Sequence, residues 1–385
     1  MRAVSFAVSI IFMFLIEAPW CLHSQSDNTA SGPSPEAVVP SLAAAYEHYF
    51  PIGAAVEPQS LNTQGDFLVA QVSSLVAENA MKWDHIHPRR GNDVSSYNFS
   101  GADAIVDFAR QNGMLIRGHT LVWHNQVPFW VFRGDSGTAT RAEVLERMRE
   151  HISTVLTHFR GKVYCWDVVN EALSDGGGTW RVESPWFKAA GDDENGDGIP
   201  DYIVKAFEYA RSADPTARLF YNDYGIEAGE KLEKAYSLVK ALKEKGLIDG
   251  VGIQGHWSIY SPDAETVRNA IKRFASLGVE VQITELDLSV YRWGDSSSLT
   301  ALQPNLASQQ AARYGALFKV FRDEAAVGGD APSSGHGKLS GVTFWGIADD
   351  HTWLDSFPVT GRKDWPLLFD VDHHPKSAFW AVVHW

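Results

Sequence analysis

Short apolar runs alternate with longer stretches of helical periodicity along most of the chain, and this alternation limits the possible folds more than any other feature. Eight runs have the length and composition of buried strands: 51–56, 78–83, 115–123, 163–170, 217–223, 250–256, 279–286 and 341–347. Apolar residues recur at helical spacing in 101–111, 141–160, 203–212, 230–245, 264–277 and 308–326. Strands that alternate with helices predict a parallel sheet in an α/β protein.

Eight parallel strands can close into a barrel, or they can form an open sheet with helices on both faces. The polar residues favour the barrel, because nearly every predicted strand ends in Glu, Asn, His, Gln, Asp or Trp at its carboxyl side. In a barrel all these ends meet on one face, where the active site belongs. In an open sheet, only the strands beside the topological switch point would contribute residues to the binding site. We therefore expect an α/β protein with a single (β/α)8 TIM barrel domain.

The N-terminal segment predicts export. Arg2 precedes an apolar run from Ala3 to Ile16, which is too short to span a bilayer. We expect 1–24 to be a signal peptide, 25–40 a flexible leader rich in Ser, Pro, Asn and Ala, and 41–385 the folded domain of a protein secreted to the periplasm or the medium. The alternative is a cytosolic protein with an unusual apolar N-terminal helix.

Composition narrows the class of partner. The formal net charge of -14 repels phosphate backbones and anionic lipids, so we expect neither nucleic acid nor, after signal cleavage, a membrane as partner. The 14 Trp residues favour a carbohydrate ligand, because flat apolar faces stack on sugar rings. Cys21 and Cys165 supply neither a disulfide framework nor a cysteine metal site. We expect a monomer.

Two predicted strands end in a glutamate that follows an apolar run. Glu171 lies in WDVVNEA and Glu285 in ITELDL. Glycoside cleavage requires one protonated carboxyl group for the leaving oxygen and one ionised carboxylate at the anomeric carbon. Retaining enzymes hold the two groups about 5 to 5.5 Å apart and inverting enzymes about 6.5 to 9.5 Å apart, a difference that the residues alone leave open. A single glutamate at a strand end is more often a solvated rim residue, so its neighbours must decide.

The neighbours of both glutamates favour catalysis. Asn170 immediately precedes Glu171, where an amide can hydrogen-bond a sugar hydroxyl beside the scissile bond. His256 ends the sixth predicted strand, next to the seventh, and Asp287 lies two residues after Glu285 on the same strand face. We predict a carboxylate–imidazole–carboxylate chain in which His256 keeps Glu285 ionised.

Seven strand-end segments together resemble glycoside hydrolase family 10, the β-1,4-xylanases. In chain order they are ENAMKW, RGHTLVWHNQVP, WDVVNEA, YNDY, IQGHW, ITELDL and VTFWGIADDHTW, and the similarity extends from about Ser41 to Trp385. The resemblance implies a retaining endo-β-1,4-xylanase that hydrolyses xylan and xylo-oligosaccharides through a covalent glycosyl-enzyme and requires no cofactor for catalysis. It also implies that Glu171 is the general acid/base and Glu285 the nucleophile.

The resemblance further implies the sugar-binding residues. Those that enclose the sugar on the non-reducing side of the cut would be Lys82, His119, Trp123, Asn170, Gln254, His256 and Trp345. Glu78 and Asn79 would hold the next xylose, and Trp353 would cover that sugar. Tyr224 would stack on the leaving-group side. Xylose lacks the hydroxymethyl group of glucose, so bulky aromatic side chains and Lys82 would exclude glucan sterically.

Two other functions stay open from the sequence. A cellulase or a mixed exo-glycanase of the same clan would differ in the polymer it prefers. A carbohydrate-binding barrel without catalysis would belong to another class, and the joint presence of both glutamates and His256 speaks against it.

The acidic loop between Trp186 and Ile203 resembles an insertion relative to the family pattern. Oxygen ligands stand near alternate positions around a glycine turn, at Asp193, Asn195, Asp197 and Asp201. Such spacing is typical of calcium loops of the EF-hand type, although Val204 replaces their bidentate Glu. We predict a structural Ca²⁺ that stiffens this loop beside Glu171. The alternative is an acidic surface turn in which Asp201 caps the next helix.

Overall fold

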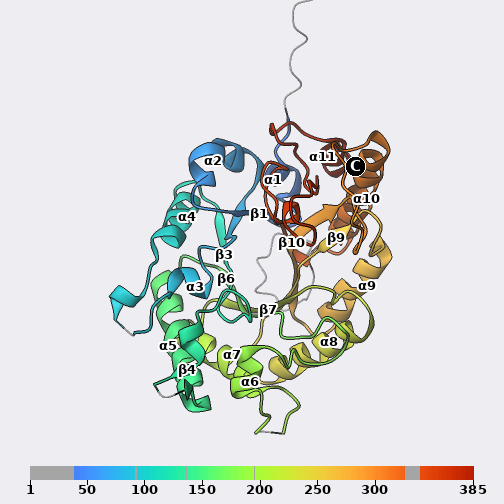
Figure 1. Ribbon diagram of the computed structural model, residues 1–385. Helices are drawn as coiled ribbons and strands as arrows, with labels where there is room; N and C mark the ends of the chain where they lie inside the picture. The colour runs from blue at the N-terminus through green and yellow to red at the C-terminus, as the bar shows by residue number, and fades with distance from the viewer. Residues whose placement is uncertain (1–38, 92, 136, 195, 326–338) are drawn as a thin grey trace, which may run out of the picture. The chain divides into compact units, whose positions relative to one another are not determined.

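The strands of this protein pair into a closed parallel barrel (Figure 1). The computed structural model describes residues 39–91, 93–135, 137–194, 196–325 and 339–385. Eight of the strands in these ranges make up the barrel: β1 (Ile52–Val56), β2 (Ser74–Ala77), β3 (Leu115–Gly118), β6 (Cys165–Asn170), β7 (Arg218–Asp223), β8 (Gly250–Ile253), β10 (Glu280–Ser289) and β11 (Leu339–Phe344). β11 pairs with β10 and with β1, which closes the ring. The expected (β/α)8 TIM barrel is confirmed, and the open sheet is excluded.

The predicted signal peptide, 1–24, and residues 25–38 of the predicted leader lie outside the described residues. Residues 39–385 form one compact unit. Within the described ranges, no helix is both long enough and apolar enough to cross a membrane.

The long helices follow the strands along the chain and lie around the outside of the barrel (Figure 1). They are α2 (Ser60–Gln71), α4 (Ser100–Gln111), α5 (Arg141–Phe159), α7 (Asp201–Ala213), α8 (Gly229–Glu244), α9 (Ala264–Ala275) and α10 (Pro304–Asp323). α5 begins with a capping box formed by Thr140 and Glu143. α2 was not predicted, because its sequence has little apolar periodicity and it buries only Gln64, Leu68 and Gln71.

Shorter elements complete the fold. They are the helices α1 (Leu42–Tyr46), α3 (Trp83–Ile86), α6 (Pro185–Ala190) and α11 (Ser377–Val383), the hairpin β4 (Arg133–Gly134) and β5 (Gly137–Thr138), and β9 (His256–Ser258). β9 pairs with the last third of β10 and so extends the sheet beyond the barrel at one edge.

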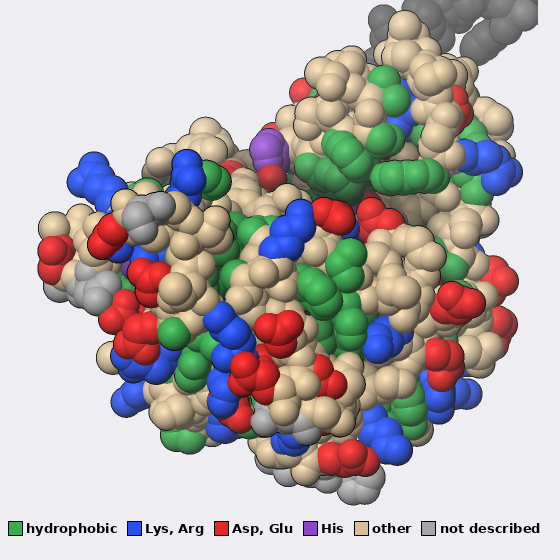
Figure 2. All heavy atoms as spheres, turned by 60° about the horizontal axis from the view of Figure 1, so that its bottom comes forward, with side chains coloured by type: hydrophobic (Ala, Val, Ile, Leu, Met, Phe, Trp, Pro, Cys, Tyr) green, Lys and Arg blue, Asp and Glu red, His purple; other side chains and the backbone are tan. Residues whose placement is uncertain are grey.

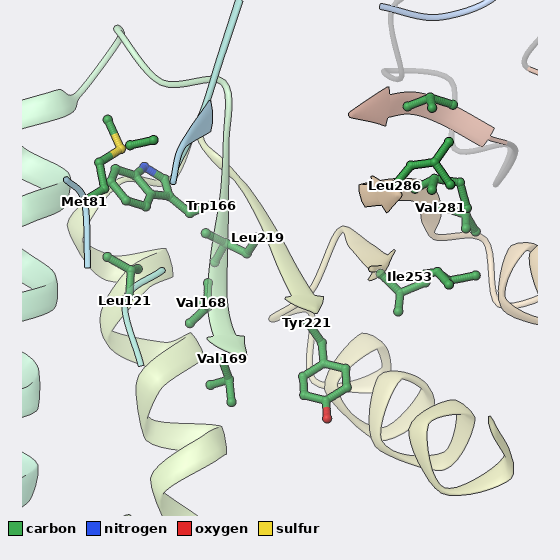
Figure 3. Packing of buried hydrophobic residues seen from close by; sticks show 14 of the residues in the cluster. Met81, Leu121, Trp166, Val168, Val169, Leu219, Tyr221, Ile253, Val281 and Leu286 are labelled. Atoms are coloured by element: carbon green, nitrogen blue, oxygen red, sulfur yellow. The ribbon is translucent and has the colours of Figure 1, made fainter. Parts of the chain in front are cut away.

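Most residues of the barrel strands are buried, because these strands are covered on both faces. Figure 3 shows Trp166, Val168 and Leu219 among the buried side chains of this core. The barrel interior also holds a buried ion pair, in which Arg117 donates to Asp167 and to the Oε1 atom of Gln282 at 2.7 Å. The interior is therefore filled with side chains, as the fold requires.

The second strand lies earlier in the chain than the sequence indicated. We predicted a strand over 78–83, but β2 covers Ser74–Ala77, and Trp83 already opens α3. The run Ser74–Ala77 lies directly before the predicted range, and its pairing with β1 and β3 fixes it as the strand. Glu78 is therefore the first residue after the carboxyl end of β2.

The third strand is shorter than the predicted range of 115–123, since β3 ends at Gly118. The backbone N–H groups of Leu121 and Val122 instead donate to Asp167 and Val168 of β6 at 3.0 Å. The chain thus continues along the neighbouring strand without forming a regular ladder, and it delivers Trp123 to the carboxyl face.

Candidate active site

The carboxyl ends of the barrel strands carry the residues that the sequence singled out. By position they are Glu78, Asn79 and Lys82 after β2, His119 and Trp123 after β3, Asn170 and Glu171 at β6, Tyr224 after β7, Gln254 and His256 after β8, Glu285 and Asp287 in β10, and Trp345 and Trp353 after β11. Figure 2 shows a face of the molecule on which hydrophobic, acidic and basic side chains meet along a hollow. One face of the barrel therefore holds the whole candidate site.

Glu285 is buried, with a side chain that is 6% exposed. Asn222 of β7 donates its Nδ2 to Glu285 Oε1 at 2.7 Å, and His256 Nε2 lies 3.0 Å from Glu285 Oε2. Burial alone would raise the pKa of Glu285, but the hydrogen bond from His256 and the positive charge beside it lower this pKa to about 2. Glu285 is therefore ionised at neutral pH.

His256 lies between two carboxylates, as the sequence predicted. Its Nδ1 atom is 2.8 Å from Asp287 Oδ2, opposite the side that faces Glu285. Burial alone would lower the pKa of His256, but the charge of Asp287 and the hydrogen bonds to both carboxylates raise it to about 10. His256 is a cation at neutral pH, so both of its ring nitrogens donate.

A short interruption between two strands positions this histidine. Gly255, with a φ of +84°, separates β8 from β9, and β9 then pairs with β10 so that His256 stands opposite Asp287. A Cβ atom at Gly255 would come within 2.9 Å of Ile283. Glycine is therefore required at this turn on both conformational and steric grounds.

Glu171 follows the last residue of β6 and has an unusual backbone, with a φ of +56°. Its carboxylate accepts three hydrogen bonds from uncharged donors. Trp123 Nε1 donates to Oε2 at 2.8 Å, and Gln254 Nε2 and Asn170 Nδ2 donate to Oε1 at 2.9 and 3.3 Å. The Glu171 side chain is 12% exposed, about twice the value for Glu285.

Amide side chains connect the two glutamates. Asn170 Oδ1 accepts from Asn222 Nδ2 at 2.9 Å and from Gln254 Nε2 at 3.3 Å. The same Asn222 amide donates to Glu285, and the same Gln254 amide donates to Glu171. Both carboxylates therefore face one hydrogen-bonded site.

A cluster of charged and polar side chains lies at the β2 end of the site. Lys82 is buried and donates its Nζ to Asn79 Oδ1 at 3.0 Å, and it lies over the ring of Trp123 at 4.8 Å. Burial lowers the pKa of Lys82, while the carboxylates of Glu285 and Glu78 act in the opposite direction. These groups present donors and acceptors in fixed directions, which suits the equatorial hydroxyls of a sugar.

Aromatic side chains enclose the same space. His119 and His256 both lie edge-on to Trp345, with ring centroids 5.3 and 6.1 Å away. Trp353 packs against His256 at 4.8 Å and donates its Nε1 to Asp287 Oδ2 at 2.8 Å. The indoles thus provide apolar faces next to Glu285.

Tyr224 follows the last residue of β7, and polar side chains hold its ring in place. Its hydroxyl contacts Asp175 and accepts from Arg181 Nη2 at 3.0 Å, while Lys231 lies 3.8 Å from the ring centroid. Burial raises the pKa of Tyr224, so its phenol stays neutral. The ring is fixed as a flat apolar surface.

The comparison with known families agrees with this geometry. The sequence profile of glycosyl hydrolase family 10 matches residues 41–385. The chain belongs to glycosyl hydrolase family 10. It is 46% identical over 347 residues to the beta-1,4-xylanase of Dictyoglomus thermophilum, a match that covers 90% of this chain and 91% of the relative. It is also 46% identical to the endo-1,4-beta-xylanase of Geobacillus stearothermophilus, covering 90% and 98%.

Solved structures of similar proteins share the fold of this glycoside hydrolase. Xylanase XynB from Paenibacillus barcinonensis, complexed with a conduramine derivative, is 44% identical and has a TM-score of 0.82, with 91% of this chain and 99% of that chain covered. A mutant solved in complex with xylotriose is also 44% identical and has a TM-score of 0.81, with coverage of 90% and 99%.

The structure adds residues to this family 10 site that the sequence reasoning did not single out. Asn222 bridges the two halves of the site, and its place within the motif YNDY was its only signal in the sequence. Asp167 lies 3.0 Å from His119 Nδ1. His351 Nε2 lies 2.8 Å from Glu78 Oε2, in a contact between the loop after β11 and the end of β2. Distant strands and loops supply these partners, so no local pattern indicates them.

The acidic loop has protein partners for each described candidate calcium ligand. Asp193 accepts the backbone N–H groups of Asp197 and Gly198 at 2.9 and 2.8 Å, Asp197 pairs with Lys245 at 2.9 Å, and Asp201 pairs with Arg141. Asn195 lies outside the described residues. Asp201 is the first residue of α7 and follows the N-cap residue Pro200.

Proposed function

We propose that Glu171 and Glu285 are the two catalytic carboxylates of an endo-β-1,4-xylanase that hydrolyses internal bonds of xylan with retention of configuration. The observation that carries this proposal is the asymmetry of their surroundings. Glu285 receives hydrogen bonds from a cationic His256 and from Asn222, whereas Glu171 receives bonds from neutral donors only. The cationic donor assigns Glu285 as the nucleophile, and Glu171 is then the general acid/base.

The reaction then proceeds by double displacement. Glu285 attacks the anomeric carbon and forms the covalent glycosyl-enzyme, while Glu171 protonates the leaving oxygen. Glu171 next takes a proton from water, and that water releases the sugar from Glu285. Each step conserves charge with two carboxyl groups alone, so hydrolysis requires no metal or organic cofactor.

The remaining site residues bind the sugar chain in this proposal. Lys82, His119 and Trp345 contact the xylose attached to Glu285, and Glu78 and Asn79 hold the next xylose along with Trp353. Tyr224 stacks on the leaving-group side. Lys82 is buried and lies over the indoles of Trp123 and Trp345. In this proposal these side chains exclude the hydroxymethyl group of glucose sterically, which favours xylan over cellulose.

Trapping of the covalent intermediate tests the assignment of Glu285. A 2-fluoro xylobioside with a good leaving group should label the enzyme once, and mass spectrometry of the peptide digest should place the label on Glu285. The variant Glu285→Gln should take up no label. A label on any other carboxylate would overturn the assignment.

We further propose that the enzyme is a secreted monomer, and the apolar N-terminal segment supports export. N-terminal sequencing of the exported protein would locate the cleavage site, and light scattering would measure the mass. A mature protein that retains residue 1 would contradict cleavage of a signal peptide. A stable dimer would contradict the monomeric state.

The loop calcium stays a prediction, and we propose it with a direct test. A Ca²⁺ ion would have to displace the Lys245 and Arg141 contacts of Asp197 and Asp201. If the ion binds, chelation should lower the melting temperature, and added CaCl₂ should restore it in the parent but not in Asp193→Asn. An unchanged melting temperature in all these samples would contradict the prediction.

A further inference from the structure

A second cleft opens beside the proposed catalytic site. It has a volume of about 450 Å³, and the loops after β9, β10 and β11 form its walls. His256, Asp287 and Trp353 line it, so it shares residues with the site that holds Glu285. Its volume falls within the range of pockets for small ligands, and it has room for a single sugar ring.

The rim of this cleft carries an unpaired guanidinium next to an exposed indole. Arg292 is exposed and lies over the ring of Tyr260, 3.9 Å from its centroid, and the described part of the chain places no acidic side chain in an ion pair with it. Trp293 is 80% exposed and meets Phe357 with ring centroids 5.9 Å apart. A cation and a flat apolar face thus stand side by side on one loop.

The other charged groups of the cleft are only partly hydrogen-bonded, and Asp287 Oδ1 has no hydrogen-bond partner among the described residues. Asp287 accepts from His256 and Trp353. Glu227 accepts from Trp257 Nε1 at 3.0 Å, and burial raises its pKa, which disfavours its charged form. Arg362 is buried over the ring of Tyr291, and its Nε has no hydrogen-bond partner among the described residues. The cleft therefore has spare donors and cationic charge, although the chain as a whole carries -14.

We propose that this cleft binds a uronic acid side group of the xylan chain. The carboxylate of the branch pairs with Arg292, and its sugar ring stacks on Trp293. A neutral branch would use the indole but not the guanidinium, so the distinguishing feature of the preferred branch is its charge. This inference rests on the proposed xylanase function, because the cleft opens next to the residues that would hold the main chain.

The test compares glucuronoxylan with the same polymer after chemical reduction of its carboxyl groups, which keeps the branches and removes their charge. For the parent enzyme, kcat/KM should be higher on the acidic polymer at low salt. The ratio of the two values should fall about three- to fivefold in Arg292→Ala, and partly recover in Arg292→Lys. Added NaCl should lower the ratio of the parent enzyme, because salt screens an exposed ion pair.

Arg133→Ala is the matched control, since Arg133 is also exposed and lies over an aromatic ring, that of Phe129, at 4.6 Å. This variant should leave the ratio unchanged. Trp293→Ala should lower kcat/KM on both branched polymers relative to linear xylohexaose. An acidic-to-neutral ratio that is equal in the parent and in Arg292→Ala would overturn the inference. Failure of the parent to hydrolyse linear xylohexaose would instead overturn the proposed function.

Discussion

The two glutamates of the site differ in the charge of the groups that surround them. Glu285 contacts a histidine that two carboxylates keep protonated, and its own pKa falls to about 2. Glu171 also has a histidine nearby, since His124 Nδ1 lies 4.0 Å from its Oε2. Burial and the charge of Arg181 lower the pKa of His124 to about 4, so this ring is neutral at working pH. A histidine beside a carboxylate is therefore a cation in one half of the site and a neutral group in the other.

This difference shows that the residue types alone do not set the roles of the two carboxylates. Asp287 lies behind His256 and stabilises its positive charge, whereas among the described residues His124 is paired with no carboxylate other than Glu171. Burial and the nearest charges around each ring therefore decide which histidine is protonated.

The largest predicted effect is a loss of activity, and its dependence on the leaving group of the substrate distinguishes the variants of the two glutamates. Glu285→Ala should lose activity on every substrate, because no nucleophile remains. Glu171→Ala should lose about 10² to 10⁴-fold on xylan but keep most of its first-step rate on an aryl xyloside with an activated leaving group, which needs no proton. Pre-steady-state kinetics on the two substrates would measure this. Equal losses on both substrates in Glu171→Ala would contradict its role as the acid.

The next effect concerns the amide that joins the two halves. Asn222→Ala should reduce kcat on xylan by about 10²-fold, since it removes a donor to Glu285 and leaves Asn170 without one of its partners. The KM should change less than kcat. Thr284→Val is the matched control, because the Thr284 hydroxyl donates to Asn222 Oδ1 at 2.6 Å and, among the described residues, makes no hydrogen bond to either glutamate. A comparable loss in the control would indicate a merely structural role.

A smaller effect is expected from the cation beside Glu285. The ionised form of Glu285 is the active one, and its pKa lies below the ordinary value, so activity should be lost only as the pH falls toward about 2. His256→Gln removes the positive charge, and the acid limb of kcat/KM should move upward by about one pH unit or more. A pH profile of both proteins, restricted to the range in which each remains folded by circular dichroism, would measure this shift. An acid limb at the same pH in both would contradict the assigned charge of His256.

The smallest effect is predicted for the other histidine. His124→Gln replaces a ring that is already neutral above about pH 4, so it should leave kcat/KM on xylan unchanged above that pH. The same pH profile serves as the measurement. A changed profile above about pH 4 would mean that His124 carries charge beside Glu171, and the contrast between the two halves would disappear.

Much of this site could be predicted because it depends on local sequence. Glu285 and Asp287 are two residues apart on a strand, so they share a face, and His256 is the first residue of β9, which pairs beside them. The alternation of strands and helices likewise predicted the barrel, since each βα unit spans a short stretch of chain. The predicted position of β2 was wrong because it began only after the strand, whose extent is set by pairing with β1 and β3.

The sequence by itself therefore determined the barrel, the family and the set of strand-end residues that face one another. Only the tertiary structure decided which of those residues carry charge. The bridge through Asn222, the contact between His351 and Glu78, and the cleft beside Arg292 all join segments that are far apart in the chain. Protonation depends on burial and on the nearest charges in space, and these distances arise only when the barrel closes and its loops meet.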